Sequence, residues 1–164
     1  MSKINAIRLV NINYNHNAIH ISDETLRFNG RSTLISLQNG GGKSVLVQLL
    51  TAPFVQKRYR NLNERSFASY FTTPRPSFIM VEWALENGAG YCLTGMMVRK
   101  SQNMDNNEEL ELLNFISEYK EPCEQDINHL PVVENNAKEI RLKSFVACRA
   151  LFEEYKKQKL NEFF

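Results

Sequence analysis

The sequence predicts an α/β fold, in which a mixed sheet with antiparallel β-hairpins packs against a helix. A glycine-rich loop at residues 40–42 lies between an apolar run and a segment whose apolar residues recur at helical spacing. Residues 4–12 form a run rich in β-branched types, which is typical of a strand. Two more apolar runs, residues 78–85 and 91–99, flank the turn-forming residues 86–90 and predict a β-hairpin.

The N-terminal third is predicted to be a β-rich meander that leads to the loop. Residues 13–17 predict a turn, and short strand-like segments flank Asp23 and Glu24. Asn29–Gly30 is a strong turn signal. The apolar run at residues 33–36 is then predicted to be the strand that feeds the loop.

A helix is predicted after the loop, nearly all buried, ending or kinking near Pro53. Residues 102–109 are polar and acidic and predict a surface loop. Residues 112–116 and 127–133 predict two short strands. A last helix is predicted from about Ser144, with one apolar face: Phe145, Cys148, Leu151, Phe152 and Tyr155.

Length and composition indicate one ordinary globular domain. The 164 residues are 43% hydrophobic and 23% charged, which excludes a disordered chain. The net charge of +2 means that any contact with nucleic acid must be local. Three widely spaced cysteines without a C-x-x-C pair predict neither disulfides nor zinc, and they favour a reducing cytoplasm. No signal-peptide or membrane-spanning segment is found, so no membrane partner is expected.

The stretch from Leu37 to Ser44, Leu-Gln-Asn-Gly-Gly-Gly-Lys-Ser, matches the second half of a phosphate-binding (Walker A) loop. Consecutive glycines let backbone N–H groups point at phosphate oxygens. Lys43 would place a positive charge at the β- and γ-phosphates, and the Ser44 hydroxyl would ligate Mg²⁺. Leu37 replaces the first glycine of the full pattern. The predicted cofactors are ATP and Mg²⁺, with binding residues Asn39, Gly40, Gly41, Gly42, Lys43, Ser44 and Val45.

Positive charge gathers downstream of the predicted helix. Lys57, Arg58, Arg60 and Arg65, with Tyr59 among them, would make a short patch that contacts DNA phosphates. A solvated surface segment is the alternative interpretation. The histidines at positions 16, 20 and 129 are scattered along the chain, so no constellation for covalent catalysis is predicted.

The order of these elements resembles the N-terminal ATPase-head segment of the structural-maintenance-of-chromosomes (SMC) group and its relatives among repair ATPases and condensin-like plasmid-defence proteins. The resemblance covers roughly residues 3–100, and its loop, with Gly41 in place of the usual serine, is its most specific part. It implies the N-terminal lobe of an ABC-type P-loop ATPase head over residues 1–164, with residues 138–164 leading toward a coiled-coil arm. It also implies roles in chromosome segregation, repair or defence.

The resemblance further implies that this chain is one half of the ATPase. No apolar run after position 44 ends in the Asp-Glu pair of a Walker B strand, and no Ser-Gly-Gly signature motif occurs. We therefore expect no catalytic residue in this chain, although Arg60 or Arg65 would lie near the nucleotide. The expected partners are the C-terminal ATPase lobe of the same protein, a second head in an ATP-sandwiched dimer, and DNA. The chain ends on Phe163–Phe164, which is the ending expected of a fragment.

Two other function classes stay open. A different P-loop enzyme, such as a kinase or GTPase, would continue with alternating strands and helices, whereas a hairpin follows here. In a non-enzymatic β-rich interaction domain, the three glycines would form only a turn. Nucleotide binding separates that class from the others.

Overall fold

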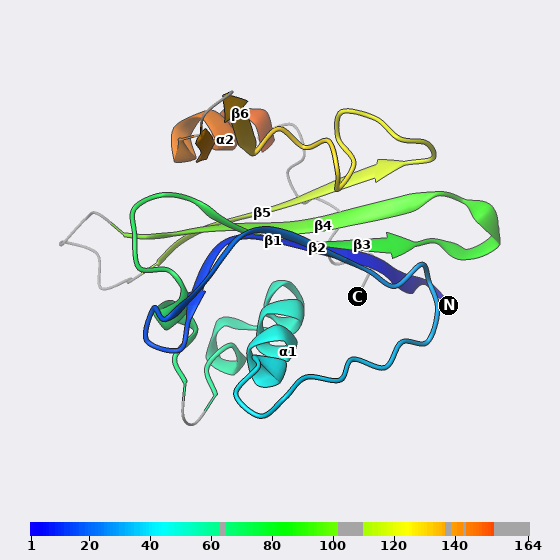
Figure 1. The fold of residues 1–164 in the computed structure, drawn as a ribbon. Helices are drawn as coiled ribbons and strands as arrows, with labels where there is room; N and C mark the ends of the chain where they lie inside the picture. The colour runs from blue at the N-terminus through cyan, green and yellow to red at the C-terminus, as the bar shows by residue number, and fades with distance from the viewer. Residues whose placement is uncertain (63–64, 102–109, 137–138, 143, 153–164) are drawn as a thin grey trace.

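The protein is described by a computed structural model that covers residues 1–62, 65–101, 110–136, 139–142 and 144–152. A five-stranded sheet in the order β2-β1-β3-β4-β5 forms its centre (Figure 1). Its strands are β1 (Lys3–Tyr14), β2 (Ile19–Arg27), β3 (Ser77–Ala84), β4 (Tyr91–Lys100) and β5 (Leu110–Tyr119). Every neighbouring pair in this sheet is antiparallel.

The predicted α/β fold, the lobe of an ABC-type P-loop ATPase with a mixed sheet, is wrong. The fold is β-rich, with 40% strand and 21% helix. Parallel strands need long crossover connections, usually helical, whereas the described neighbours in this sheet all run antiparallel. Residues 33–36, predicted to be a strand, have no strand partner among the described residues. An apolar run forms a strand only where a neighbouring strand supplies the ladder.

Both faces of the sheet are covered, which gives three layers (Figure 1). Helix α1 (Lys43–Thr51) lies on one face. The short 3₁₀ turns η1 (Ala52–Phe54), η2 (Lys57–Tyr59) and η3 (Phe67–Tyr70) follow it. Helix α2 (Phe145–Phe152) and the hairpin of β6 (Val133–Asn136) and β7 (Glu139–Leu142) lie on the other side. The remaining turn, η4 (Glu86–Gly88), joins β3 to β4.

A local irregularity in β1 decides which residues face α1. Leu9 packs in the core on the α1 side and Val10 in the core on the other side, as strand alternation requires. Asn11 has a φ of 55°, and Ile12 then packs on the α1 side again. The left-handed residue therefore reverses the alternation. The Asn11 carbonyl also accepts a hydrogen bond from the Ser77 hydroxyl at 2.6 Å, which ties the irregularity to β3.

Several predicted elements are confirmed. The first strand, the Asn29–Gly30 turn, the hairpin of β3 and β4 and the strand over residues 112–116 are all present. The helix after the loop ends at Thr51, two residues before Pro53. It is not nearly all buried, because Val47 is 60% exposed. The predicted strand at residues 127–133 is instead mostly loop, and residues 102–109 lie outside the described part of the chain.

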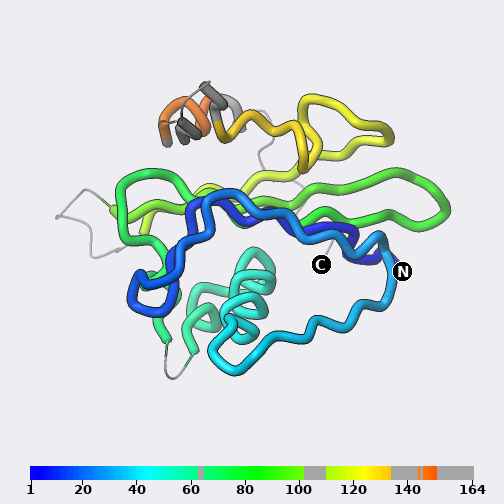
Figure 2. Tube along the Cα trace, in the orientation of Figure 1, coloured from blue at the N-terminus to red at the C-terminus, as the bar shows by residue number. Residues whose placement is uncertain are grey.

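Residues 31–42 depart furthest from the prediction. They leave the sheet after β2 and return to the start of α1 as an open arc (Figure 2). The side chains at positions 31–41 are all exposed, and Leu34 reaches 93%. The loop therefore arrives at α1 on a segment that has no sheet support among the described residues.

Gly95 in β4 is predicted to be essential to the core. It lies directly opposite Phe115 of β5, and a Cβ at Gly95 would stand 2.1 Å from the Phe115 ring. Because Phe115 is fully buried, its ring has no room to move. We expect Gly95→Ala to lower the free energy of unfolding by about 1–3 kcal/mol, measured by urea denaturation. The double variant Gly95→Ala/Phe115→Leu should recover part of that loss, and an unchanged free energy in Gly95→Ala would contradict the prediction.

Candidate functional site

The glycine-rich loop ends where α1 begins. Gly42 is the N-cap residue, with φ of 91° and ψ of 15°, and Gly40 has a φ of 83°. Between them, the Gly41 amide donates to the Gln38 carbonyl at 2.9 Å. Glycine adopts positive φ without the steric cost that other residues incur. The two glycines therefore permit this turn.

Space is also tight for a side chain at two of these positions. A Cβ at Gly41 would stand 2.9 Å from the Gln38 carbonyl oxygen, and one at Gly42 would stand 3.3 Å from the ring of Tyr14. The loop backbone thus lies directly beside Tyr14. A tight turn of backbone N–H groups leading into a helix N-terminus is an arrangement that favours anions.

Lys43 and Ser44 are the first two residues of α1, and both side chains are exposed. The Lys43 ammonium donates to the Leu37 carbonyl at 2.7 Å, so the lysine spans the loop from its end to its start. Leu37 occupies the position of the first glycine in the full phosphate-loop pattern. The contact uses a backbone carbonyl, which leucine supplies as well as glycine does. The departure at position 37 therefore leaves this contact intact.

The predicted nucleotide-binding residues are consecutive in the chain and span the turn and the start of α1. Residues 39–44 form the turn and the first residues of α1, and Val45 anchors that helix because it is only 4% exposed. Val45 and Leu49 pack in the core on this face of the sheet. The exposed loop is therefore held by a buried helix.

Tyr14, which lies beside Gly42 of the loop, also lines a polar cavity of ≈390 Å³. Its lining comes from the turn between β1 and β2 and from the segment before β3. The lining residues are Tyr14, Asn15, His16, Asn17, Arg65, Ser66, Ser69, Tyr70 and Thr72.

The turn that lines this cavity has an unusual backbone. Asn15, His16 and Asn17 have φ values of 54°, 54° and 65°. Non-glycine residues rarely adopt this left-handed conformation, although asparagine tolerates it better than most, and such residues gather at functional sites. Here the Ala18 amide bonds to the Asn15 carbonyl at 3.0 Å, and positive φ at the two central residues is what a tight turn between antiparallel strands needs, so the β1–β2 hairpin accounts for this backbone.

The predicted basic patch is divided in the structure. The Arg60 guanidinium donates to the Ala52 carbonyl at 3.0 Å, and burial lowers the pKa of Arg60. Arg60 therefore stabilises the end of the α1 region. Arg65 instead lines the polar cavity, while Lys57 and Arg58 are exposed. The Arg58 guanidinium lies 4.6 Å from the centre of the Tyr59 ring, within the range of a cation–π contact.

An apolar groove of ≈210 Å³ runs between the loop, α1 and the edge strand β2. Leu37, Gly41 and Gly42 line it from the loop, and Val45, Leu46 and Leu49 line it from the helix. The other lining residues are Leu9, Tyr14, Ile21, Glu24 and Leu26. Tyr14 thus lines both the polar cavity and the apolar groove, whereas the loop lines the groove.

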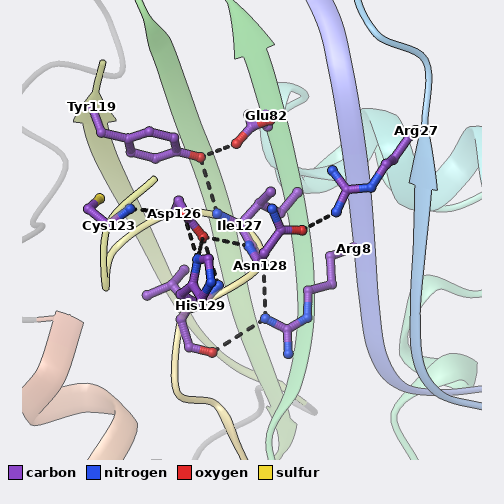
Figure 3. Close-up of polar contacts among 10 residues, drawn as sticks. Arg8, Arg27, Glu82, Tyr119, Cys123, Asp126, Ile127, Asn128 and His129 are labelled. Atoms are coloured by element: carbon purple, nitrogen blue, oxygen red, sulfur yellow. Dashed lines mark hydrogen bonds and ion pairs between the residues drawn. The ribbon is translucent and has the colours of Figure 1, made fainter. Parts of the chain in front are cut away.

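A second polar cluster lies on the opposite face of the sheet, where it holds residues 120–132 (Figure 3). Arg8 makes a two-point ion pair with Asp23, with both N–O distances 2.8 Å. Its remaining nitrogen donates to the carbonyls of Ile127 at 2.9 Å and Leu130 at 3.3 Å. The guanidinium is nearly fully buried, so these partners compensate the loss of hydration that burial imposes on its charge.

Asp126 organises the same loop from within. Its carboxylate accepts hydrogen bonds from the backbone amides of Cys123, Asn128 and His129 at 2.7–3.0 Å. It also accepts one from Nδ1 of the His129 ring at 2.7 Å. Burial alone would raise the pKa of Asp126, but these hydrogen bonds together lower it below its ordinary value of 3.8.

Tyr119 attaches this loop to the sheet. Its hydroxyl donates to Glu82 of β3 and accepts from the Ile127 amide at 3.1 Å. Burial and the neighbouring Glu82 carboxylate raise the pKa of Tyr119. The cluster therefore consists of groups that satisfy one another. His129 is oriented by a carboxylate, but among the described residues no three His, Cys, Asp or Glu side chains gather as a metal site would require.

Comparison with known proteins adds no family. Neither the protein-family models nor the curated proteins searched contain a match to this chain. In the part of the chain that the structure describes, none of the helices has the length and apolar character needed to span a bilayer. The interpretation of the site therefore depends on its own geometry.

Sequence reasoning missed three features of the site. Tyr14 was assigned to a turn, although it ends β1 and touches the loop. For the cavity residues 15–17 the sequence predicts only a turn. The asparagines at positions 15 and 17 are the hint of the left-handed backbone, because asparagine tolerates positive φ. The apolar pattern of the predicted helix does not mark Gln48 as a site residue, yet Gln48 is a buried polar side chain.

Asp126 is predicted to make stability depend on pH at the acidic end. Because its pKa is lower in the folded chain than in the unfolded chain, its contribution is complete above the unfolded value and is lost as pH falls through the folded value. We expect Asp126→Asn to cost about 1–3 kcal/mol at pH 7. It should also flatten the loss of stability below about pH 4. Denaturation curves from pH 7 to pH 2 measure both effects, and parallel pH profiles of wild type and variant would contradict the prediction.

Proposed function

We propose that residues 39–44 bind the phosphates of a nucleoside triphosphate, in the manner of a Walker A loop. The observation that carries this proposal is the arrangement of Gly40 and Gly42 at positive φ directly before Lys43 and Ser44 at the start of a nine-residue helix. The Lys43 ammonium already reaches back across the loop to Leu37. It is therefore placed to meet an anion held between the loop and the helix.

The donor set fits ATP with Mg²⁺. Backbone amides and the Lys43 ammonium are donors for phosphate oxygens, and the exposed Ser44 hydroxyl is an oxygen ligand of the kind that Mg²⁺ takes. Bound Mg²⁺ neutralises charge on the β- and γ-phosphates. A Cβ at Gly40 would meet nothing within 4 Å, so the backbone there is open to an approaching anion.

The polar cavity accommodates the nucleoside end of the ligand. It borders Tyr14, which itself lies beside Gly42, so one side chain separates the cavity from the loop. Asparagine, serine and threonine side chains offer hydrogen bonds to a ribose or base. Arg65 supplies a positive charge at this cavity and is the better candidate of the two arginines, because Arg60 is occupied by the Ala52 carbonyl.

Hydrolysis requires more than this chain supplies. Phosphoryl transfer to water needs a second metal ligand and a carboxylate that orients the water. The sequence after position 44 contains no apolar run that ends in Asp-Glu. We therefore propose that a C-terminal ATPase lobe of the same protein completes the site, and that two such heads sandwich ATP, as the resemblance to SMC-like proteins implies.

The exposed segment before the loop supports the proposal that a second lobe completes the site. Residues 31–38 are extended and exposed, and Leu34 and Ile35 offer apolar side chains to solvent. The groove beside them is apolar too. A strand from the completing lobe would cover both. The biological setting proposed is DNA organisation, repair or defence in the cytoplasm, where the three cysteines would stay thiols as they are here.

A β-rich interaction domain remains the alternative function. The antiparallel sheet favours it, because such a domain needs no nucleotide and the glycines would serve only as a turn. The kinase or GTPase alternative is weaker, since the strands that follow α1 form an antiparallel hairpin.

Lys43 is predicted to be required for nucleotide binding. Titration of the chain with ATP and Mg²⁺, alone and with its C-terminal lobe, should show binding that Lys43→Ala reduces by at least about tenfold, because charged hydrogen bonds to phosphate are lost. Lys120→Ala, a change at an exposed lysine after β5, is the matched control and should bind as wild type does. The phosphate-loop proposal fails if neither preparation binds nucleotide, or if Lys43→Ala binds as well as wild type.

Lys57 and Arg58 are predicted to contact DNA phosphates. We expect Lys57→Glu/Arg58→Glu to weaken DNA binding and to lower the slope of log affinity against log salt by about one for each residue. Electrophoretic mobility shifts over a salt series measure both quantities. The double variant Arg75→Glu/Lys120→Glu makes the same change of charge at exposed positions elsewhere. Equal losses of DNA affinity in the two double variants would show that only net charge matters, and the patch would then be ruled out as a DNA contact.

A further inference from the structure

Gln48 is the buried polar side chain of α1, and its amide is fully engaged. It is 4% exposed and lies between Val45 and Leu49 on the buried side of the helix. Its oxygen accepts a hydrogen bond from the Tyr70 hydroxyl. Its nitrogen donates to the backbone carbonyls of Arg60 at 2.7 Å and Arg65 at 3.4 Å. A side-chain amide has one acceptor and two donor hydrogens, so both sides of the group are used.

The partners of Gln48 belong to the segment that carries Arg65. Leu62 and Arg65 exchange backbone hydrogen bonds at 3.0 and 3.1 Å, and Asn61 accepts the Phe67 amide at 2.9 Å. Phe67 and Tyr70 then enter the core. The backbone at both ends of this short loop is therefore tied to α1 through one amide group.

This placement connects the two parts of the proposed site. Gln48 lies five residues after Lys43 on the same helix, a rise of about 7.5 Å. Arg65 lines the polar cavity together with Tyr14, and Tyr14 touches Gly42 of the loop. The Gln48 amide thus joins the helix that begins at the loop to the arginine beside the cavity.

An apolar residue would satisfy the helix pattern better than glutamine does. Leucine at position 48 would keep most of the buried volume but would leave the Arg60 and Arg65 carbonyls and the Tyr70 hydroxyl without these partners. Burial raises the pKa of Tyr70 and Arg65 opposes that shift, which indicates that the arginine lies close to the same hydroxyl. A satisfied buried polar group favours one arrangement of its neighbours over others.

We propose that Gln48 is a positioning residue of the nucleotide site: it fixes Arg65 relative to the phosphate loop, and nucleotide affinity depends on it through Arg65. The inference rests on the proposed function and adds a specific coupling to it. Gln48 does not contact the ligand. Its effect on affinity should therefore vanish once the Arg65 side chain is removed.

A double-mutant cycle tests this coupling. Affinity for ATP with Mg²⁺ is measured by calorimetric titration for wild type, Gln48→Leu, Arg65→Ala and the double variant, with the C-terminal lobe present in every case. We expect Gln48→Leu to weaken binding about three- to tenfold in the wild-type background. In the Arg65→Ala background the same substitution should have no further effect. Gln56→Leu, at an exposed glutamine, is the matched control and should bind as wild type does.

A milder variant, Tyr70→Phe, tests the same coupling in case Gln48→Leu unfolds the chain. Tyr70→Phe removes one hydroxyl and keeps the buried ring, so it should retain the fold and weaken binding by a smaller factor that also disappears without Arg65. If wild type binds no nucleotide, the proposed function fails and this inference fails with it. If wild type binds, but Gln48→Leu and Tyr70→Phe weaken binding equally with and without Arg65, then the phosphate loop stands and the positioning role of Gln48 is wrong.

Discussion

The packing of α1 against the sheet is the contact on which the site depends. Val45 and Leu49 of the helix, and Ala52 at the start of η1, are buried in one core cluster with Ile7, Ile79 and Met96 of the central strands. Burial of apolar surface stabilises this contact by about 25 cal/mol for each Å² removed from water. Because the helix is fixed in this way, the position of its first residues, Lys43 and Ser44, is fixed as well, and both residues are exposed. The loop needs no core residue of its own between Leu37 and Gly42, since its position comes from the helix it leads into.

The opposite face shows how a polar cluster can secure a loop that has no regular structure. Arg8 of β1 binds Asp23 of β2 and two carbonyls of residues 120–132, so one buried guanidinium joins two strands and a loop. Asp126 supplies acceptors for three backbone amides of that loop. Residues 127–133 are apolar enough to predict a strand but form none over most of their length. The amides of residues 127–129 bond to the side chains of Tyr119 and Asp126, and those of Leu130 and Val132 bond to carbonyls within the loop, so these amides do not join a strand ladder. The sheet is thus covered on both faces. Helix α1 covers one face, and the loop of residues 120–132, held by Arg8 and Asp126, covers much of the other.

Local pattern predicted the parts of the fold that local chemistry determines. Alternating apolar residues and the Glu86–Gly90 turn were enough for the hairpin of β3 and β4, and the glycines before Lys43 were enough for the loop and helix. The fold class was wrong because strand direction and pairing depend on residues far apart in the chain, such as Ile7 with Val81. Residues 33–36 have the composition of a strand but pair with no strand in the part of the chain that the structure describes. The reversal at Asn11 and the burial of Gln48 are equally non-local, since each depends on a partner more than ten residues away.

The glycine-rich loop is held by contacts within the chain, whereas residues 31–38 before it are exposed, and this difference bears on binding. The turn at Gly40–Gly42 is closed by the hydrogen bond from the Gly41 amide to the Gln38 carbonyl, and it leads into a helix held by buried Val45 and Leu49. Binding to such a site does not have to order the backbone, which preserves affinity. The segment at residues 31–38 is the opposite case, because its apolar side chains are exposed and it has no strand partner among the described residues. A partner that paired with this segment would fix the start of the loop at Leu37, whose carbonyl holds Lys43. Pairing at residues 31–38 would therefore reach the Lys43 side chain through a single backbone carbonyl.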